Sequence, residues 1–122
     1  MTPGKPYYFN AYEDEEREIT PLAYEDVTTL SEVYNYDPIL PRLNKKEVEN
    51  IMGVQANLWA EYVVNGEVAE YMTFPRLCAL SETGWSPGEL KDYKDFIQRL
   101  KINSKQLDGL HVNYSKYFMN EK

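Results

Sequence analysis

The sequence contains one cysteine and no long apolar run, and these two shortages limit the classes of protein it can represent. The single cysteine, Cys78, cannot form an internal disulfide, so an oxidising compartment is neither required nor excluded. It lies in an apolar helical pattern and is expected to be a small core residue. No stretch reaches the roughly 20 apolar residues of a membrane span, and the N-terminus lacks a signal-peptide core. We therefore expect a soluble chain without membrane contact.

Basic residues are also scarce: 13 Lys and Arg stand against 20 Asp and Glu, for a net charge of −7. No basic cluster could neutralise phosphates, so nucleic acid is not expected as a partner. The acidic charge gathers in "EDEERE" at residues 13–18, which lacks the ligand spacing and glycine turn of a calcium loop. That run is expected to be a solvated loop or a helix start. Neither a metal nor a cofactor is implied.

Apolar and aromatic side chains are well represented. With 122 residues, 43% apolar and 14% aromatic, the chain is one domain at most and is not expected to be disordered. Tyrosine is the main aromatic, with 11 copies against two tryptophans and four phenylalanines. Tyrosine suits surfaces that contact carbohydrate or protein, and it equally suits half-buried positions on helices. Composition alone leaves both interpretations open.

Two short helices are indicated by capping patterns. Thr29 and Glu32 have the spacing of a capping box, and an apolar stripe follows. Asn44 and Glu47 repeat the pattern and predict a second helix that reaches about residue 50. The prolines in "YDPILPRL" separate the two, because proline cannot continue a helix.

Two longer helices follow in the second half of the chain. One is expected over residues 67–83, with Pro75 causing either a kink or a restart. The other is expected over residues 89–110, opened by "SPGE" and carrying one apolar stripe. His111 then lies where a helix often turns left-handed. It has no nearby serine or cysteine partner, so it is expected to be a surface or capping residue and not a catalytic base.

One strand-like run, residues 51–59, separates the short helices from the long ones. Its alternate side chains, continued to residue 61, differ in chemistry. One parity is small or aliphatic: Met52, Val54, Ala56 and Leu58. The other is polar or aromatic: Gln55, Asn57, Trp59 and Glu61. Such a strand needs neighbours on both edges, and residues 7–9 are the other strand candidate. The sequence therefore looks like part of a larger unit.

Several motifs, in order, carry a family resemblance. "GVQANLWAEYV", "EYMTFPRLCALSETGWSP" and "DFIQRL…LDGLHVNY" strongly resemble the end of the catalytic domain of family 20 glycoside hydrolases, the β-N-acetylhexosaminidases. "MTPGKPYYFNAY" and "PLAYEDVTTLSEVYNYDP" match the preceding segment of that domain. The resemblance covers essentially the whole chain, which makes it more specific than any one motif.

The resemblance implies an α/β fold, the (β/α)8 barrel. Such a barrel takes roughly 250 residues, so residues 1–122 would be its C-terminal third or less, helix-rich with one or two strands and without a second domain. The tract before Tyr8 would end the seventh strand, and the run at 51–59 would be the eighth. The small and aliphatic parity would then face the outer helices, and the polar and aromatic parity would face the lumen.

The resemblance also implies a mechanism in which the substrate's own 2-acetamido oxygen attacks the anomeric carbon. Tyr8 matches the catalytic tyrosine that hydrogen-bonds this oxygen. Trp59 matches a tryptophan that walls the acetamido pocket, and Glu61 matches a glutamate that accepts hydrogen bonds from sugar hydroxyls. Asn10 stands where the family usually has a hydroxyl-binding aspartate. An N-acetylhexosamine-terminated glycan is the implied partner, and the compartment stays open, since family members are commonly secreted, periplasmic or lysosomal.

The family's adjacent Asp–Glu pair, with its glutamic acid that protonates the leaving group, is absent from this sequence. The pair Asp14–Glu15 lies in the acidic run and lacks the family's histidine and glycine context. The 122-residue chain alone is therefore expected to be inactive. Three hypotheses remain: a fragment of a β-N-acetylhexosaminidase, a non-catalytic sugar-binding or protein-interaction module, and a purely structural helical unit. Exposed apolar faces on such a fragment predict self-association.

Overall fold

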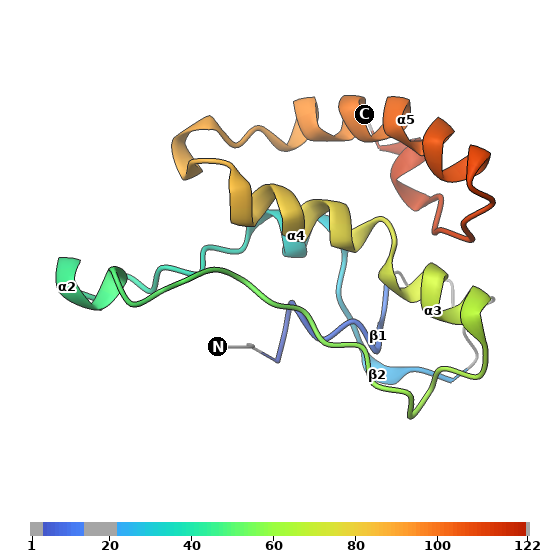
Figure 1. The fold of residues 1–122 in the computed structure, drawn as a ribbon, viewed down its shortest axis with the longest axis horizontal. Coiled ribbons are helices and arrows are strands. Elements are labelled where there is room, and N and C mark those ends of the chain that lie inside the picture. Colours follow the sequence, from blue (N-terminus) through green and yellow to red (C-terminus); the bar gives the residue numbers. More distant parts are fainter. Residues whose placement is uncertain (1–3, 14–21, 122) are drawn as a thin grey trace.

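The computed structural model describes residues 4–13 and 22–121. The strands and helices follow in the order β1 (Ala11–Tyr12), β2 (Tyr24–Val27), α1 (Leu30–Asn35), α2 (Lys45–Val48), α3 (Gly66–Thr73), α4 (Arg76–Trp85) and α5 (Tyr93–Gly109). Two 3-10 helical turns lie at Gly88–Leu90 and Tyr117–Asn120. Figure 1 shows α5 lying over α4, with the extended chain that leads into α3 on the opposite side of α4.

Both predicted capping boxes are confirmed. Thr29 caps α1 and exchanges hydrogen bonds with Glu32, and Asn44 caps α2 in the same way with Glu47. These local bonds satisfy backbone N–H groups that a helix start leaves without partners, which is why the sequence pattern alone located both starts. The second helix is shorter than expected and ends at Val48.

The predicted helix over 67–83 is two helices. α3 ends at Thr73, and α4 begins at Arg76, so the chain restarts at Pro75. The restart follows from proline, which has no N–H to donate and whose ring clashes with the preceding helical turn.

The start predicted for the last helix was wrong. α5 begins at Tyr93 because the side chain of Asp92 accepts hydrogen bonds from the N–H groups of Lys94 and Asp95. The "SPGE" signal instead opens the 3-10 turn at Gly88–Leu90, with Pro87 at its N-cap. The predicted left-handed residue is confirmed, since His111 has a φ of 58°.

The hydrophobic core lies between the paired N-terminal segment and helices α1, α4 and α5. Tyr34 of α1 stacks on Phe96 of α5 with ring centroids 4.7 Å apart. The other buried members of this core are Tyr7, Phe9, Leu30, Val33, Ala79, Leu80, Ile97, Leu100, Tyr114 and Phe118. Cys78 is half-buried against the same core, and burial raises the pKa of its thiol.

The strand-like run at 51–59 is extended but pairs over a single bridge. Phe9 N donates to Asn57 O at 2.8 Å, and Asn57 N donates to Tyr7 O at 2.9 Å. This makes a parallel bridge between Tyr8 and Asn57. The candidate strand at 7–9 is therefore the neighbour of the run, as its sequence suggested.

The predicted division of the run into two faces holds from residue 54 onward. The aliphatic positions Val54, Ala56 and Leu58 pack against the helical core. Met52 was assigned to the same face and is instead fully exposed, at 100%. Gly53 separates it from Val54 with a φ of 154°, a conformation that side-chain-bearing residues rarely adopt, so the alternation does not extend back across it.

A two-stranded parallel sheet was not predicted. β1 pairs with β2, and Ala11 is opposite Tyr24. A fully buried arginine, Arg76, lies beside this sheet at the start of α4. Its guanidinium donates to the carbonyl oxygens of Phe9 at 2.8 Å and Ala11 at 3.0 Å. Arg76 also donates to the carbonyls of Thr28 and Met72, so one side chain joins the N-terminal segment to two further segments.

The acidic run lies mostly outside the described residues. Its first member, Glu13, directly follows β1 and is buried at 7% exposure, so the expectation of a solvated residue was wrong there. None of the helices within residues 4–13 and 22–121 is long and apolar enough to cross a bilayer.

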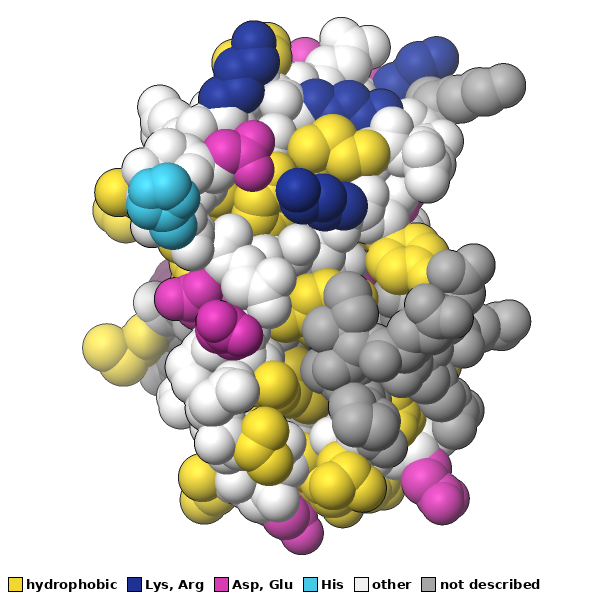
Figure 2. Space-filling model, turned by 90° about the vertical axis from the view of Figure 1, so that its right-hand side faces the viewer, with side chains coloured by type: hydrophobic (Ala, Val, Ile, Leu, Met, Phe, Trp, Pro, Cys, Tyr) yellow, Lys and Arg dark blue, Asp and Glu magenta, His cyan; other side chains and the backbone are white. Residues whose placement is uncertain are grey.

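Large apolar side chains also reach the surface. On the face shown in Figure 2 they lie scattered among polar and charged side chains. The strongly exposed members over the whole described chain are Leu22, Tyr24, Met52, Trp59, Val64, Trp85, Leu90, Ile102 and Leu110. Several of these lie on or next to α4 and α5.

Candidate functional site

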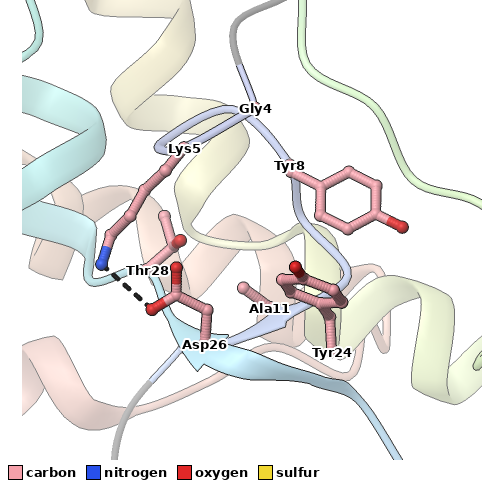
Figure 3. Close-up of a pocket in the computed structure, with 7 residues that line it drawn as sticks. All are labelled: Gly4, Lys5, Tyr8, Ala11, Tyr24, Asp26 and Thr28. Atoms are coloured by element: carbon pink, nitrogen blue, oxygen red, sulfur yellow. Dashed lines mark hydrogen bonds and ion pairs between the residues drawn. The ribbon is translucent and has the colours of Figure 1, made fainter.

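Tyr8 lies on the side of the N-terminal segment opposite the core residues Tyr7 and Phe9. It borders a cavity of about 430 Å³ that is lined by Gly4, Lys5, Tyr8, Ala11, Tyr24, Asp26 and Thr28. In Figure 3 the Lys5–Asp26 ion pair lies on one side of this cavity and the tyrosine rings on the other. The Tyr8 ring meets the Tyr24 ring edge-on, with centroids 5.6 Å apart.

The environment of Tyr8 keeps its phenol protonated. Desolvation raises the pKa of the Tyr8 hydroxyl, and the negative charge of Glu61 and the phenols of Tyr62 and Tyr24 raise it further. The contribution from Glu61 means that Tyr8 and this carboxylate lie within electrostatic range of each other. Two residues that the sequence analysis singled out are thus brought to one region from segments more than fifty positions apart in sequence.

Trp59 and Glu61 both lie at the surface. The Trp59 side chain is 60% exposed, which is unusual for so large an apolar group. Glu61 is exposed two residues further along the same parity. Trp59 directly follows the core-facing residue Leu58, which places its side chain on the face that carries Tyr8. Glu61 lies in the turn at residues 60–61, and its charge acts on Tyr8.

Asn10 lies against the backbone of Trp59. It is fully buried, and its side-chain oxygen accepts a hydrogen bond from Trp59 N at 2.7 Å. Its side-chain nitrogen donates to Trp59 O at 2.8 Å. Asn10 and Trp59 are therefore joined directly, through an amide group that faces the protein backbone.

The three accessible groups of this face have complementary chemistry. A neutral phenol such as Tyr8 donates a hydrogen bond, and an ionised carboxylate such as Glu61 is a strong acceptor. The indole of Trp59 offers a flat apolar surface with one polar edge. A ligand that carries several hydroxyl or amide groups on a partly apolar ring would satisfy all three. Among the described residues, no group of three or more His, Cys, Asp or Glu side chains could hold a metal ion.

Residues 1–88 match the glycosyl hydrolase family 20 catalytic domain, over nearly three-quarters of the chain. The chain belongs to glycosyl hydrolase family 20. A β-hexosaminidase from Porphyromonas gingivalis is 35% identical to it over 114 residues, which are 93% of this chain and 15% of that protein.

Solved structures of family 20 proteins agree with this assignment. The exo-β-N-acetylglucosaminidase of Vibrio harveyi, crystallised in complex with N-acetylglucosamine, superimposes with a TM-score of 0.83 at 30% identity over 94% of this chain and 18% of that one. The β-N-acetylhexosaminidase of Streptomyces coelicolor has a TM-score of 0.80 at 26% identity over 94% of this chain and 23% of that one. The predicted fold class, a helix-rich piece of a (β/α)8 barrel, is confirmed.

The chain spans about 15% of the length of the two curated β-hexosaminidases that it matches, from Porphyromonas gingivalis and Akkermansia muciniphila. Its assignment to the C-terminal third or less of the barrel stays a prediction. So do the roles given to Tyr8, Trp59, Glu61 and Asn10.

Sequence reasoning missed several residues around this face. The Tyr24 ring contacts the Tyr8 ring. Lys5 and Asp26 line the same cavity and form an ion pair, with 3.2 Å between Lys5 Nζ and Asp26 Oδ1. Tyr24 and Asp26 belong to β2, whose pairing with β1 has no strong periodic signal in the sequence. The available signal was the abundance of tyrosine, which composition alone could not assign to a site.

Proposed function

We propose that this chain is part of a β-N-acetylhexosaminidase, which removes terminal N-acetylhexosamine from glycans by substrate-assisted, retaining catalysis. In this proposal Tyr8 donates a hydrogen bond to the acetamido oxygen as that oxygen attacks the anomeric carbon. Trp59 walls the acetamido pocket, and Glu61 accepts hydrogen bonds from hydroxyls of the terminal sugar. Family membership and the N-acetylglucosamine complex of the Vibrio harveyi relative support this choice of sugar.

The observation that carries the proposal is that Tyr8, Trp59 and Glu61 are accessible in one region. The helical core takes up Tyr7, Phe9 and Leu58, so Tyr8 and Trp59 point away from it, and the charge of the exposed Glu61 acts on Tyr8. The raised pKa of the Tyr8 hydroxyl supports its role, because a neutral phenol can donate to developing charge without acting as a nucleophile itself.

The chain carries the binding half of such a site. The family motif that contains the adjacent Asp–Glu pair, and with it the general acid, is absent from this sequence. We therefore expect the 122-residue chain to bind N-acetylglucosamine and to leave the glycosidic bond intact. A non-catalytic sugar-binding module is the second reading of the same residues, and for the chain alone it makes the same binding prediction.

The test compares binding and hydrolysis in one preparation. Titration calorimetry should detect N-acetylglucosamine binding that glucose, which lacks the acetamido group, does not reproduce. Tyr8→Phe should weaken that binding, while Tyr36→Phe, on the core-facing side next to Tyr7, should leave it unchanged. A chromogenic N-acetyl-β-glucosaminide should not be hydrolysed.

Two outcomes contradict the proposal. Equal affinities for glucose and N-acetylglucosamine would show that the chain has no pocket that recognises the acetamido group. Hydrolysis that Tyr8→Phe abolishes would mean that the chain holds a general acid, and the dismissal of the acidic run at 13–18 would be wrong.

We also propose that the isolated chain self-associates. The exposed apolar residues on and beside α4 and α5, and the extended run at 51–59, support this because such surfaces favour burial against another chain. Light scattering across a concentration series should show growth in mass. A monodisperse monomer at high concentration would contradict it.

A further inference from the structure

We infer that Asn10 is a positioning residue that holds the backbone of Trp59 through its side-chain amide and makes no contact with the sugar. The inference rests on the proposed function, because Trp59 is the proposed wall of the acetamido pocket. It departs from the hydroxyl-binding role that the family resemblance implied for Asn10, and it assigns the amide a task that a carboxylate cannot perform.

Backbone pairing between the two segments stops just before Trp59. The bridge consists of Phe9 N donating to Asn57 O at 2.8 Å and Asn57 N donating to Tyr7 O at 2.9 Å. One more step of a parallel ladder would use the backbone N–H and C=O of Trp59.

The groups that would make this next step are directed elsewhere. Phe9 O accepts a hydrogen bond from the guanidinium of Arg76 at 2.8 Å. Ala11 N donates to Tyr8 O at 3.3 Å. Among the backbone hydrogen bonds of the described residues, neither Phe9 O nor Ala11 N pairs with Trp59, so the backbone ladder does not continue to it.

The side chain of Asn10 supplies the missing step. Its oxygen accepts from Trp59 N at 2.7 Å, and its nitrogen donates to Trp59 O at 2.8 Å. A carboxamide carries the same donor and acceptor as a peptide unit, so it acts as one further rung of the ladder. Asn10 is fully buried, which leaves its amide directed at Trp59 and away from solvent.

This arrangement holds the backbone of a residue whose side chain is left free to meet a ligand. The indole of Trp59 stays 60% exposed. A fixed backbone reduces the conformational freedom that Trp59 would lose on binding a sugar, and preorganisation of this kind strengthens binding without adding a contact.

The two possible roles of Asn10 predict opposite results for Asn10→Asp. An ionised carboxylate can accept from Trp59 N–H, but it has no donor for Trp59 C=O and would set a negative oxygen against that carbonyl. A positioning role therefore predicts a loose Trp59 and weaker sugar binding. A direct hydroxyl contact predicts equal or tighter binding, because a carboxylate is the stronger acceptor.

The first measurement needs no variant. Hydrogen exchange followed by NMR should find the Trp59 backbone N–H protected, although the side chain of the same residue is exposed. Exchange at the rate of an unstructured peptide would overturn the inference.

The second measurement follows the mobility of Trp59 by fluorescence anisotropy and acrylamide quenching. Trp85→Phe provides the background, since the chain has two tryptophans and Trp85 is 90% exposed. In this background Asn10→Asp should lower the anisotropy and increase the quenching at neutral pH. Asn113→Asp is the matched control, because Asn113 Nδ2 also donates to a carbonyl, that of Glu67, on an exposed part of the chain.

A pH series distinguishes a lost hydrogen bond from a change in packing, because only the hydrogen bond is restored when the carboxyl is protonated. A protonated carboxyl regains one donor and one acceptor, so the Asn10→Asp variant should recover the anisotropy of the parent as pH falls. Arg76 donates to the carbonyls on both sides of Asn10, and Tyr24 of β2, which is followed by Glu25 and Asp26, pairs with the Asn10 backbone. Glu13 follows three residues later, and Glu61 lies two residues beyond Trp59. The parent carries all of them, so its own pH series isolates the effect of the new carboxyl. Asn10→Leu, which cannot regain a donor, should show no recovery.

The third measurement connects Asn10 to the sugar. At neutral pH the Asn10→Asp variant should bind N-acetylglucosamine about tenfold more weakly than the parent, and acidification should restore the affinity. Unchanged or tighter binding with unchanged anisotropy would overturn the inference. If the parent itself binds no sugar, the proposed function fails, and the exchange and anisotropy measurements still decide whether Asn10 holds Trp59.

Discussion

The two faces of the segments 7–9 and 54–61 show how one stretch of backbone serves two purposes. On one face Tyr7 and Phe9 pack with the helices in a buried core. On the other, Tyr8 borders an open cavity and Trp59 is largely exposed. The same alternation of side chains that builds the core therefore presents the candidate site.

The residues of the two faces are expected to contribute to different quantities, the free energy of folding on one face and the free energy of sugar binding on the other. Apolar groups on the core face lower the free energy of folding in proportion to the surface they bury. An exposed tryptophan contributes little to folding, and in the proposed function Trp59 contributes to sugar binding instead. Substitutions should accordingly separate the two faces: the core side should affect stability, and the open side should affect sugar binding.

The largest expected effect belongs to the buried arginine that supports the core face. Arg76→Met removes donors from four backbone carbonyls, those of Phe9, Ala11, Thr28 and Met72. Buried acceptors left without partners are costly, so the free energy of unfolding should fall by about 3 kcal/mol. Urea unfolding followed by circular dichroism would measure it.

Arg99→Met is the matched control for Arg76→Met. Arg99 bridges Glu82 and Asp95 at the surface, with a side chain 47% exposed. Exposed ion pairs contribute little, so its loss should cost less than about 1 kcal/mol. Equal losses for the two arginines would contradict the role assigned to Arg76.

A smaller effect, confined to binding, is expected on the open face. Trp59→Ala should weaken N-acetylglucosamine binding by about tenfold, because the flat apolar surface is lost. The free energy of unfolding should change by no more than about 0.5 kcal/mol, as is usual for surface positions. Calorimetric titration and urea unfolding would separate the two quantities.

Trp85→Ala is the corresponding control, since Trp85 is even more exposed and lies at the end of α4. It should leave both quantities unchanged. Loss of sugar binding in this variant would show that recognition is not confined to the face that carries Tyr8.

The smallest expected effect depends on pH. The hydrogen bond from Arg99 holds the pKa of Glu82 below its ordinary value, against the opposing effect of desolvation. A lowered folded-state pKa stabilises the fold above the unfolded-state value, about 4.3, and this stabilisation disappears as pH falls through the folded-state pKa.

Glu82→Gln should therefore lower the free energy of unfolding by up to about 1 kcal/mol at neutral pH, since Arg99 is partly exposed. Parent and variant should converge on acidification. Urea unfolding across an acid series would test this, and a difference that persists at the acid end would assign the effect to packing instead of charge.

Local patterns in the sequence predicted the features that depend on near neighbours. The capping boxes at Thr29 and Asn44 were correct because the bonds they make span three residues. The apparent helix start at "SPGE" was wrong because Asp92, a few residues later, offers a competing cap that satisfies two N–H groups. When two candidate N-caps lie close together, the tertiary structure selects one of them, and the local sequence pattern does not show which.

Arg76 illustrates a signal that was present and not used. A single arginine within "MTFPRLCAL" stands in an otherwise apolar stretch, which is typical of a charged group that enters the core with partners. Three of its four carbonyl partners lie 48 to 67 positions away, and nothing in the local sequence indicates them.

The sequence by itself determined the family, the capped helix starts and the two chemistries that alternate along residues 54–61, because each depends on residue identity or on spacing over a few positions. Only the tertiary structure decided that Asn10 turns its amide to the backbone of Trp59. In the same structure Phe9 O, the acceptor that a backbone ladder would use, accepts from Arg76 on a distant helix. Donors and acceptors from segments that are distant in sequence can pair in several ways, and only the packed tertiary structure determines which hydrogen bonds form.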